Sequence, residues 1–218
     1  MRGSLRAGGA VMNLRYRKLK ERPPPLVVVC DISGSMSRYS RLLLHFAHAL
    51  ANGRERVHSF VFGMRLTNIT RYLARRDPDV ALEMAREAVS DWSGGTQIGS
   101  CLRTFNHRWS RRVLGQGAVI VLISDGLDRD GGVSLSEEME RMHKSCRRVI
   151  WLNPLLRYSE FEPRALGVKA MLPHVDEFRP IHNLDCVADL ARALGGDETA
   201  DMPAARVRHI RGAKFDGC

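Results

Sequence analysis

Three oxygen-bearing side chains follow an apolar run at alternate positions: Asp31, Ser33 and Ser35. A carboxylate and two hydroxyls are hard oxygen donors, which suit a hard divalent cation such as Mg²⁺. Gly34 lies between the two serines and lets the backbone turn tightly. This loop therefore predicts part of a metal site.

Two later segments carry donors of the same kind. Residues 92–96 form a glycine-rich turn before a helical pattern and offer the Thr96 hydroxyl, and a second apolar run ends at Ser124 and Asp125. Mg²⁺ takes six oxygen ligands and usually keeps several waters, so these side chains leave room for one ligand from outside. The candidate metal ligands are Asp31, Ser33, Ser35, Thr96 and Asp125.

The elements that must position these donors are buried strands alternating with helices. The run at residues 26–30 does not alternate between apolar and polar, which is typical of a strand covered on both faces of a parallel sheet. We expect strands at 26–30, 57–62, 66–70, 119–124 and 148–152, with 170–175 leading into a last strand. We expect helices at 38–52, 78–89, 98–109, 136–145 and 183–194. The pattern predicts an α/β fold: a mostly parallel sheet with one antiparallel edge strand and helices on both faces. Ligands bind such sheets at the carboxyl ends of the strands, where the candidate donors fall.

The order Asp31-x-Ser33-x-Ser35, then Thr96, then Asp125 resembles the metal-ion-dependent adhesion site of von Willebrand factor A domains. The segments CDISGSMSRYSRLLLHFAHAL, DWSGGTQIGSCLRTFN, VLISDGLDR and WLNPLL are similar to the CoxE-like branch of that superfamily. The resemblance implies a Rossmann-like von Willebrand factor A domain whose metal, Mg²⁺ or Mn²⁺, is completed by an Asp or Glu of a partner protein. It also implies an accessory role in the maturation of metalloenzymes related to carbon monoxide dehydrogenase, as an adaptor for a MoxR-type AAA+ ATPase.

Composition divides the chain into a core and two tails. The net charge is +10, and residues 1–22 hold seven Arg/Lys and one Glu. We expect a basic, disordered tail at 1–24, the von Willebrand factor A domain at 25–195 and a C-terminal tail at 196–218. Residues 23–200 carry 23 basic and 21 acidic residues. Because this core is nearly neutral, we do not expect nucleic acid as a partner, although a basic tail alone is able to bind it.

Cysteine usage and hydropathy favour a cytoplasmic protein. The five cysteines are scattered without a CxxC pair, which predicts reduced thiols rather than disulfides or a zinc site. No apolar run approaches the roughly 18 residues of a membrane span. His45 and His48 are spaced to share a metal, but without a third ligand nearby we expect them to serve packing or the surface.

The donors favour binding over catalysis. No Walker motif, dinucleotide fingerprint or GxSxG elbow is present. The alternative, a Mg²⁺-dependent phosphohydrolase, needs an acid two residues after Asp31, where this chain has Ser33. Asp128 and Asp130 are extra ligand candidates, although acids near such a loop are more often turn residues. We therefore predict a non-enzymatic, metal-dependent protein-interaction module.

Overall fold

A six-stranded sheet forms the centre of the computed structural model, which describes residues 23–89, 92, 95–128, 133–157, 165–181, 186, 190 and 194. The strand order is β3-β2-β1-β4-β5-β6. The strands are β1 (Leu26–Asp31), β2 (Val57–Phe62), β3 (Leu66–Asn68), β4 (Val119–Ile123), β5 (Arg148–Asn153) and β6 (Glu177–Pro180). Every neighbouring pair is parallel except β2 and β3, so the expected mixed sheet with an antiparallel edge is confirmed.

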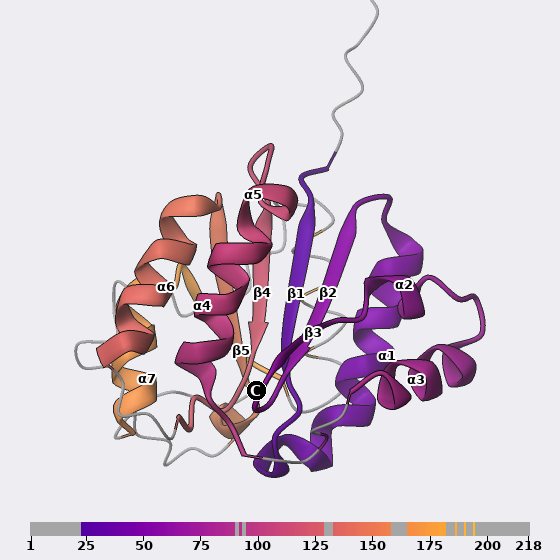
Figure 1. Ribbon diagram of the computed structural model, residues 1–218, viewed down its shortest axis with the longest axis horizontal. Helices are drawn as coiled ribbons and strands as arrows, with labels where there is room; N and C mark the ends of the chain where they lie inside the picture. Colours follow the sequence, from indigo (N-terminus) through magenta and orange to yellow (C-terminus); the bar gives the residue numbers. More distant parts are fainter. Residues whose placement is uncertain are drawn as a thin grey trace, which may run out of the picture.

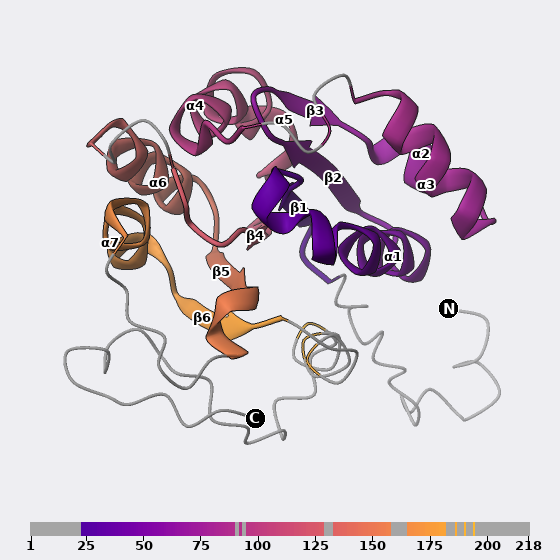
Figure 2. The ribbon, with the colours of Figure 1, turned by 90° about the horizontal axis from the view of Figure 1, so that it is seen from below.

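Helices cover both faces of this sheet (Figures 1 and 2). One face carries α1 (Ser37–Gly53), α2 (Thr70–Leu73) and α3 (Pro78–Glu87). The other carries α4 (Ile98–Arg108), α5 (Ser110–Val113), α6 (Val133–Ser145) and α7 (Leu166–Met171). Short 3-10 turns, η2 (Gly34–Met36), η3 (Pro154–Arg157) and η4 (Leu172–His174), connect these elements. Among the described residues, no helix has the length and apolar character to cross a bilayer.

The strand β1 divides its side chains between two cores. Leu26, Val28 and Cys30 pack under the α1 face, whereas Val27 and Val29 pack under the α4 face. This alternation follows from the two-residue period of a strand, and it explains why a strand buried on both faces has no polar positions. Burying such side chains stabilises the fold by about 1.5–3 kcal/mol each.

The register of the parallel strands sets the position of the candidate donors. Cys30 is paired with Ile123 across β1 and β4, so the residues that follow, Asp31 and Ser124, lie side by side at the carboxyl edge. On the other side, Asp31 is paired with Phe62 at the end of β2. The carboxyl ends of three strands therefore meet at one place.

Local sequence signals explain where α3 begins. The Asp77 carboxylate accepts hydrogen bonds from the backbone N–H groups of Asp79 and Val80, and Pro78 occupies the first helical position.

Several elements differ from the expectation. The segment 170–175 leads into the last strand as expected, but it does so as the end of α7 and the turn η4, and the strand starts at Glu177. The short helices α2, α5 and α7 were not expected, because four to six residues are too few to show a helical period. Of the closing helix expected at 183–194, only Cys186, Leu190 and Leu194 are described, and these are helical. The tails expected at 1–24 and 196–218 lie outside the described residues, apart from Pro23 and Pro24.

Candidate metal centre

The loop after β1 holds three of the predicted ligands in a tight turn. The Asp31 carboxylate is buried, and its Oδ1 accepts a hydrogen bond from the Ser33 backbone N–H at 2.8 Å. The Ser33 and Ser35 hydroxyl oxygens lie 3.2 Å apart. Ser33 is buried, whereas Ser35 is exposed at the start of η2. The turn therefore presents two neighbouring hydroxyls with the solvent on one side.

The loop after β4 brings the second acid to the same edge. Asp125 is buried, and its Oδ1 accepts a hydrogen bond from the Leu127 backbone N–H at 3.0 Å. Its carbonyl accepts a second bond, at 3.1 Å, from the side-chain amide of Asn153 at the end of β5. The preceding Ser124 hydroxyl donates to Asp31 Oδ2 at 2.9 Å. This bond joins the two loops directly.

The electrostatics of the two acids favour a cation between them. Burial is the main cause that raises the pKa of Asp31 from 3.8 to about 6, and the nearby Asp125 carboxylate also raises it. The hydrogen bonds from Ser33 and Ser124 lower the pKa but do not offset the burial. Within the described residues, no Lys, Arg or His forms an ion pair with either acid. Two buried carboxylates without a basic partner are costly, and a bound cation compensates such a pair.

Thr96 lies on the segment that connects to α4. Its side chain is buried, and the next residue, Gln97, donates a backbone hydrogen bond to the Gly63 carbonyl at the end of β2. Ile98 N–H, at the start of α4, donates to Asp128 Oδ1 at 3.0 Å. Thr96 is therefore held between the β2 and β4 loops, although it makes no hydrogen bond with the other four predicted ligands among the described residues. Ser93 and Gly94 of the same turn lie outside the described residues.

The donor set and its geometry fit a hard divalent ion. Adjacent ligands of an octahedral Mg²⁺ bound at about 2.1 Å are about 3.0 Å apart, close to the separation of the Ser33 and Ser35 hydroxyls. Both Asp31 oxygens already accept protein hydrogen bonds, which suits them to hold water around the ion. Within the described part of the chain, no group of three or more His, Cys, Asp or Glu side chains is arranged to hold a metal ion, so the site depends on hydroxyls.

Two supporting residues were missed by the sequence analysis. Ser124 bonds Asp31, and Asn153 holds the Asp125 backbone. The available signal was position alone: Ser124 directly precedes Asp125, and Asn153 ends the neighbouring strand. Trp151, beneath them, donates its indole N–H to the Ser124 carbonyl at 2.9 Å.

The other candidates have structural contacts. Asp128 receives the Ile98 N–H, whereas Asp130 lies outside the described residues. His48 is buried, and its Nε2 lies 2.8 Å from the Arg75 carbonyl, so this ring nitrogen donates and serves packing. The described cysteines, Cys30, Cys101, Cys146 and Cys186, are all free, as expected.

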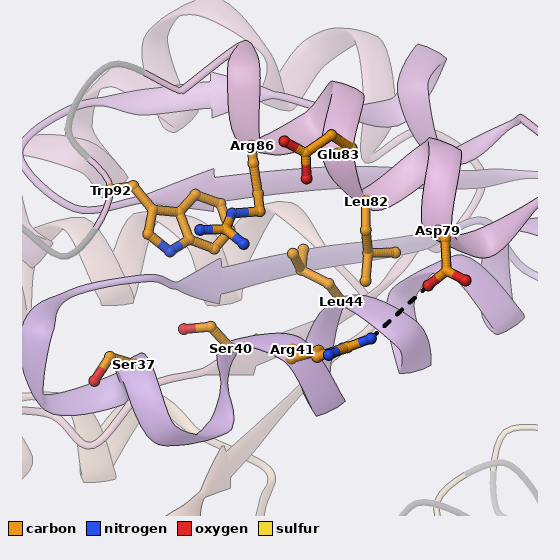
Figure 3. A pocket seen from close by; sticks show the side chains of 9 residues that line it. All are labelled: Ser37, Ser40, Arg41, Leu44, Asp79, Leu82, Glu83, Arg86 and Trp92. Carbon is orange, nitrogen blue, oxygen red and sulfur yellow. Dashed lines mark ion pairs between the residues drawn. The ribbon is translucent and has the colours of Figure 1, made fainter.

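A groove of about 460 Å³ opens beside the metal loop, between α1 and α3 (Figure 3). Ser37, two residues after Ser35, and Trp92, four residues before Thr96, lie at its walls. The Arg86 guanidinium stands over the Trp92 ring, 5.6 Å from its centroid. The groove therefore combines an apolar floor with charges of both signs. Its lining is Ser37, Ser40, Arg41, Leu44, Asp79, Leu82, Glu83, Arg86 and Trp92.

Solved structures share this fold. A von Willebrand factor type A structure from Catenulispora acidiphila matches with a TM-score of 0.57 and 14% identity, over 79% of this chain and 42% of that one. Proximal thread matrix protein 1 from the mussel byssus, with a zinc-occupied MIDAS motif (the metal-ion-dependent adhesion site), matches with a TM-score of 0.54 and 11% identity. That match covers 80% of this chain and 47% of the byssus protein. The SpaC pilus adhesin of Lactobacillus rhamnosus GG matches with a TM-score of 0.54 and 14% identity, over 82% and 30% of the two chains. This chain thus spans less than half the length of each.

These likenesses define the class, a von Willebrand factor type A fold. A comparison with curated proteins gives no match. The family model for VWA domain containing CoxE-like proteins matches residues 1–187, and the chain belongs to that family.

Proposed function

We propose that this protein is a non-enzymatic interaction module that binds an acidic side chain of a partner protein through a divalent metal ion. The observation that carries the proposal is the joined pair of loops, in which Ser124 ties Asp31 to the segment of Asp125. The metal supplies electrophilic attraction for a carboxylate when it is bound. The five proposed ligands are Asp31, Ser33, Ser35, Thr96 and Asp125.

The protein side chains leave the ion poorly neutralised. Hydroxyls are neutral ligands, and the two acids are already engaged by backbone and side-chain donors. Asp31 and Asp125 orient water, while Ser33, Ser35 and Thr96 provide direct oxygen ligands. Because Ser35 lies at the solvent side, a carboxylate from outside has access.

The surface around this edge supports a protein partner. Met64, Leu127 and Leu166 are 40%, 47% and 67% exposed, and they are three of the four large apolar side chains exposed in the described residues. Met64 follows β2, Leu127 follows Asp125, and Leu166 begins α7. Gly167 lies so close to the β4 loop that a Cβ there would collide with the Gly126 carbonyl oxygen, so Leu166 is held near Leu127. Exposed apolar side chains gathered at one edge are typical of interaction sites.

Family membership supports the finer part of the proposal. We assign as partners a MoxR-type AAA+ ATPase and its client, a metalloenzyme of the carbon monoxide dehydrogenase type. The working ion is Mg²⁺ or Mn²⁺, and the site of action is the cytoplasm. The zinc in the byssus protein's MIDAS motif supports a divalent ion at such a site. The alternative of a phosphohydrolase has no support in the described geometry, because Ser33 occupies the place of the required second acid.

The experiment is a binding assay between this chain and a MoxR-type ATPase, with Mg²⁺ or with EDTA. We expect binding only with Mg²⁺, and loss of binding in Ser33→Ala/Ser35→Ala. A matched variant, Ser37→Ala/Ser100→Ala, changes two exposed serines and should bind as wild type does. Binding that is equal in EDTA, or Mg²⁺-dependent release of phosphate from p-nitrophenyl phosphate, would contradict the proposal.

A further inference from the structure

The amino edge of the sheet, opposite the metal site, carries eight of the 23 basic residues in 23–200. Leu26 is paired with Val57 on one side and with Val119 on the other, and Val119 is paired with Arg148. Because these strands start in register, the residues just before them form a row. That row places Arg56, before β2, and Arg147, before β5, at the same edge. Three strand spacings, or about 14 Å, separate the two positions.

Four segments contribute to this amino edge. They are the turn after α1, the end of α4 with α5, the end of α6 with the turn after it, and the first residue of β5. Seven of the eight basic residues are arginines, and the same edge also carries the acids Glu55, before β2, and Asp176, before β6, whose Oδ2 accepts the Val149 N–H. The basic residues are Arg54, Arg56, Arg108, Arg111, Arg112, Lys144, Arg147 and Arg148.

Most of these basic residues form no ion pair among the described residues. Arg148 pairs with Glu177, and Lys144 pairs with Glu140. Within the described residues, no ion pair involves the other six arginines. Elsewhere on the described surface Arg41, Arg141 and Arg179 each have a carboxylate partner, whereas no ion pair involves the arginines around α2, Arg71, Arg75 and Arg76. The amino edge is therefore a concentration of unneutralised positive charge.

Local contacts fix this arrangement. The Arg56 guanidinium donates hydrogen bonds to the Gln116 side chain and to the Pro23 carbonyl, so it joins the α5–β4 turn to the segment before β1. Gln116 and Gly117 have φ of 60° and 71°, which makes this turn tight. Arg112 stacks over the ring of Trp109 at 6.0 Å. Figure 1 shows α5 beside the amino ends of β1 and β4.

We propose that the amino edge binds the phosphate backbone of nucleic acid without reading its sequence. Arginine dominates the edge, and its planar guanidinium matches phosphate oxygens in a bidentate way that lysine does not. A membrane is disfavoured, because the large apolar side chains exposed in the described residues, Met64, Val80, Leu127 and Leu166, all lie elsewhere. The summed charge of the core did not predict this partner, because a sum carries no information on where the charges lie.

The test is fluorescence anisotropy of full-length protein with labelled poly(U) RNA of about 20 nucleotides, at about 50 mM and about 200 mM NaCl. We expect binding that EDTA leaves unchanged and that the higher salt weakens. The variant Arg111→Glu/Arg112→Glu/Arg147→Glu should bind about tenfold more weakly or worse, with a salt slope smaller by about 2. The control Arg71→Glu/Arg75→Glu/Arg76→Glu makes the same charge change on three exposed arginines around α2. The affinity of this control variant for the RNA should fall much less.

Several outcomes would overturn the proposal. They are no binding of wild type at the lower salt, equal losses in the two variants, or equal affinity for polyglutamate or for phosphatidylserine vesicles. Deletion of residues 1–22, which hold seven Arg/Lys, separates the tail from the edge. If this deletion abolishes binding, the edge alone is not a site. Circular dichroism and melting of each variant exclude unfolding as the cause.

Discussion

The Ser124 hydroxyl donates to Asp31 Oδ2 at 2.9 Å and thereby links two residues that are 93 positions apart in the chain. Gly126 N–H in turn donates to the Ser124 hydroxyl oxygen at 3.0 Å. Ser124 is therefore both acceptor and donor at the junction of the two loops. It orients the buried carboxylate without occupying the solvent side of the site.

Ser124→Ala removes this orientation. We expect Mg²⁺ affinity to fall about 10–100-fold, as is typical when a group that orients a metal ligand is lost. The free energy of unfolding should fall by about 1–3 kcal/mol, because Asp31 and Gly126 each lose a partner. Isothermal titration calorimetry and urea denaturation measure the two effects. Ser110→Ala removes a serine hydrogen bond to the Asn106 carbonyl, far from the metal loops, and should leave Mg²⁺ affinity intact.

The raised pKa of Asp31 makes metal binding depend on pH. Because its pKa is about 6, Asp31 is mostly protonated below that pH and must lose its proton before the carboxylate can hold a cation. We expect the Mg²⁺ association constant to fall about tenfold for each pH unit below 6 and to be constant above it. Asp31→Asn should bind weakly and without this slope. A titration series from pH 4.5 to 8 that shows a flat profile for wild type would remove this account of Asp31.

The raised pKa of Asp31 also predicts how the stability of the metal-free protein depends on pH. The folded pKa lies above the unfolded value of 3.8, so the folded state binds the proton more tightly. The contribution of Asp31 is therefore complete below pH 3.8 and is lost as the pH rises through 6, which amounts to about 3 kcal/mol. In EDTA, Asp31→Asn should gain stability relative to wild type as the pH rises over this range. A difference in unfolding free energy between the two proteins that stays constant over this pH range would contradict this prediction.

Asp128 is expected to position Thr96 rather than to act as a ligand. Its Oδ1 accepts the Ile98 N–H, so it joins the β4 loop to the start of α4. Asp128→Ala should weaken Mg²⁺ binding about tenfold, whereas Asp128→Asn keeps an oxygen acceptor and should restore most of the affinity. Calorimetry that gives equal losses for the two variants would show that the charge of Asp128 matters, against a positioning role.

Gly126 is required by the conformation of the loop that carries Asp125. Its φ is +78°, and a Cβ there would lie 2.8 Å from the Trp151 and Val168 side chains. Gly126→Ala should cost about 2–5 kcal/mol of stability through backbone strain and overpacking. Gly115→Ala is the matched control, because nothing lies within 4 Å of its added Cβ. Similar unfolding midpoints in urea for the two variants would contradict this explanation.

The sequence predicted the sheet, and it placed the candidate donors at strand ends, because both depend on local signals. Uninterrupted apolar runs identified β1 and β4, and the residues after them supplied Asp31 and Asp125. The supporting bonds of Ser124 and Asn153 could not be predicted, because they depend on which strands are neighbours and in which register. The same limit applies to the basic amino edge, where Arg56 and Arg147 are close only because β2, β1, β4 and β5 start together. Short elements such as α7 carry too few residues for a periodic signal.

The most direct test of the central claim is a calorimetric titration of Mg²⁺ into wild type and Ser33→Ala/Ser35→Ala at pH 7.5, with thermal melting of the same samples. Aspartate amide in excess stands for the partner's carboxylate in a second series. We predict that wild type binds one Mg²⁺, is stabilised by it, and binds Mg²⁺ more tightly in the second series. The double variant should show none of these three effects. Wild type that shows no Mg²⁺ binding in either series, or a double variant that binds as wild type does, would contradict the metal site.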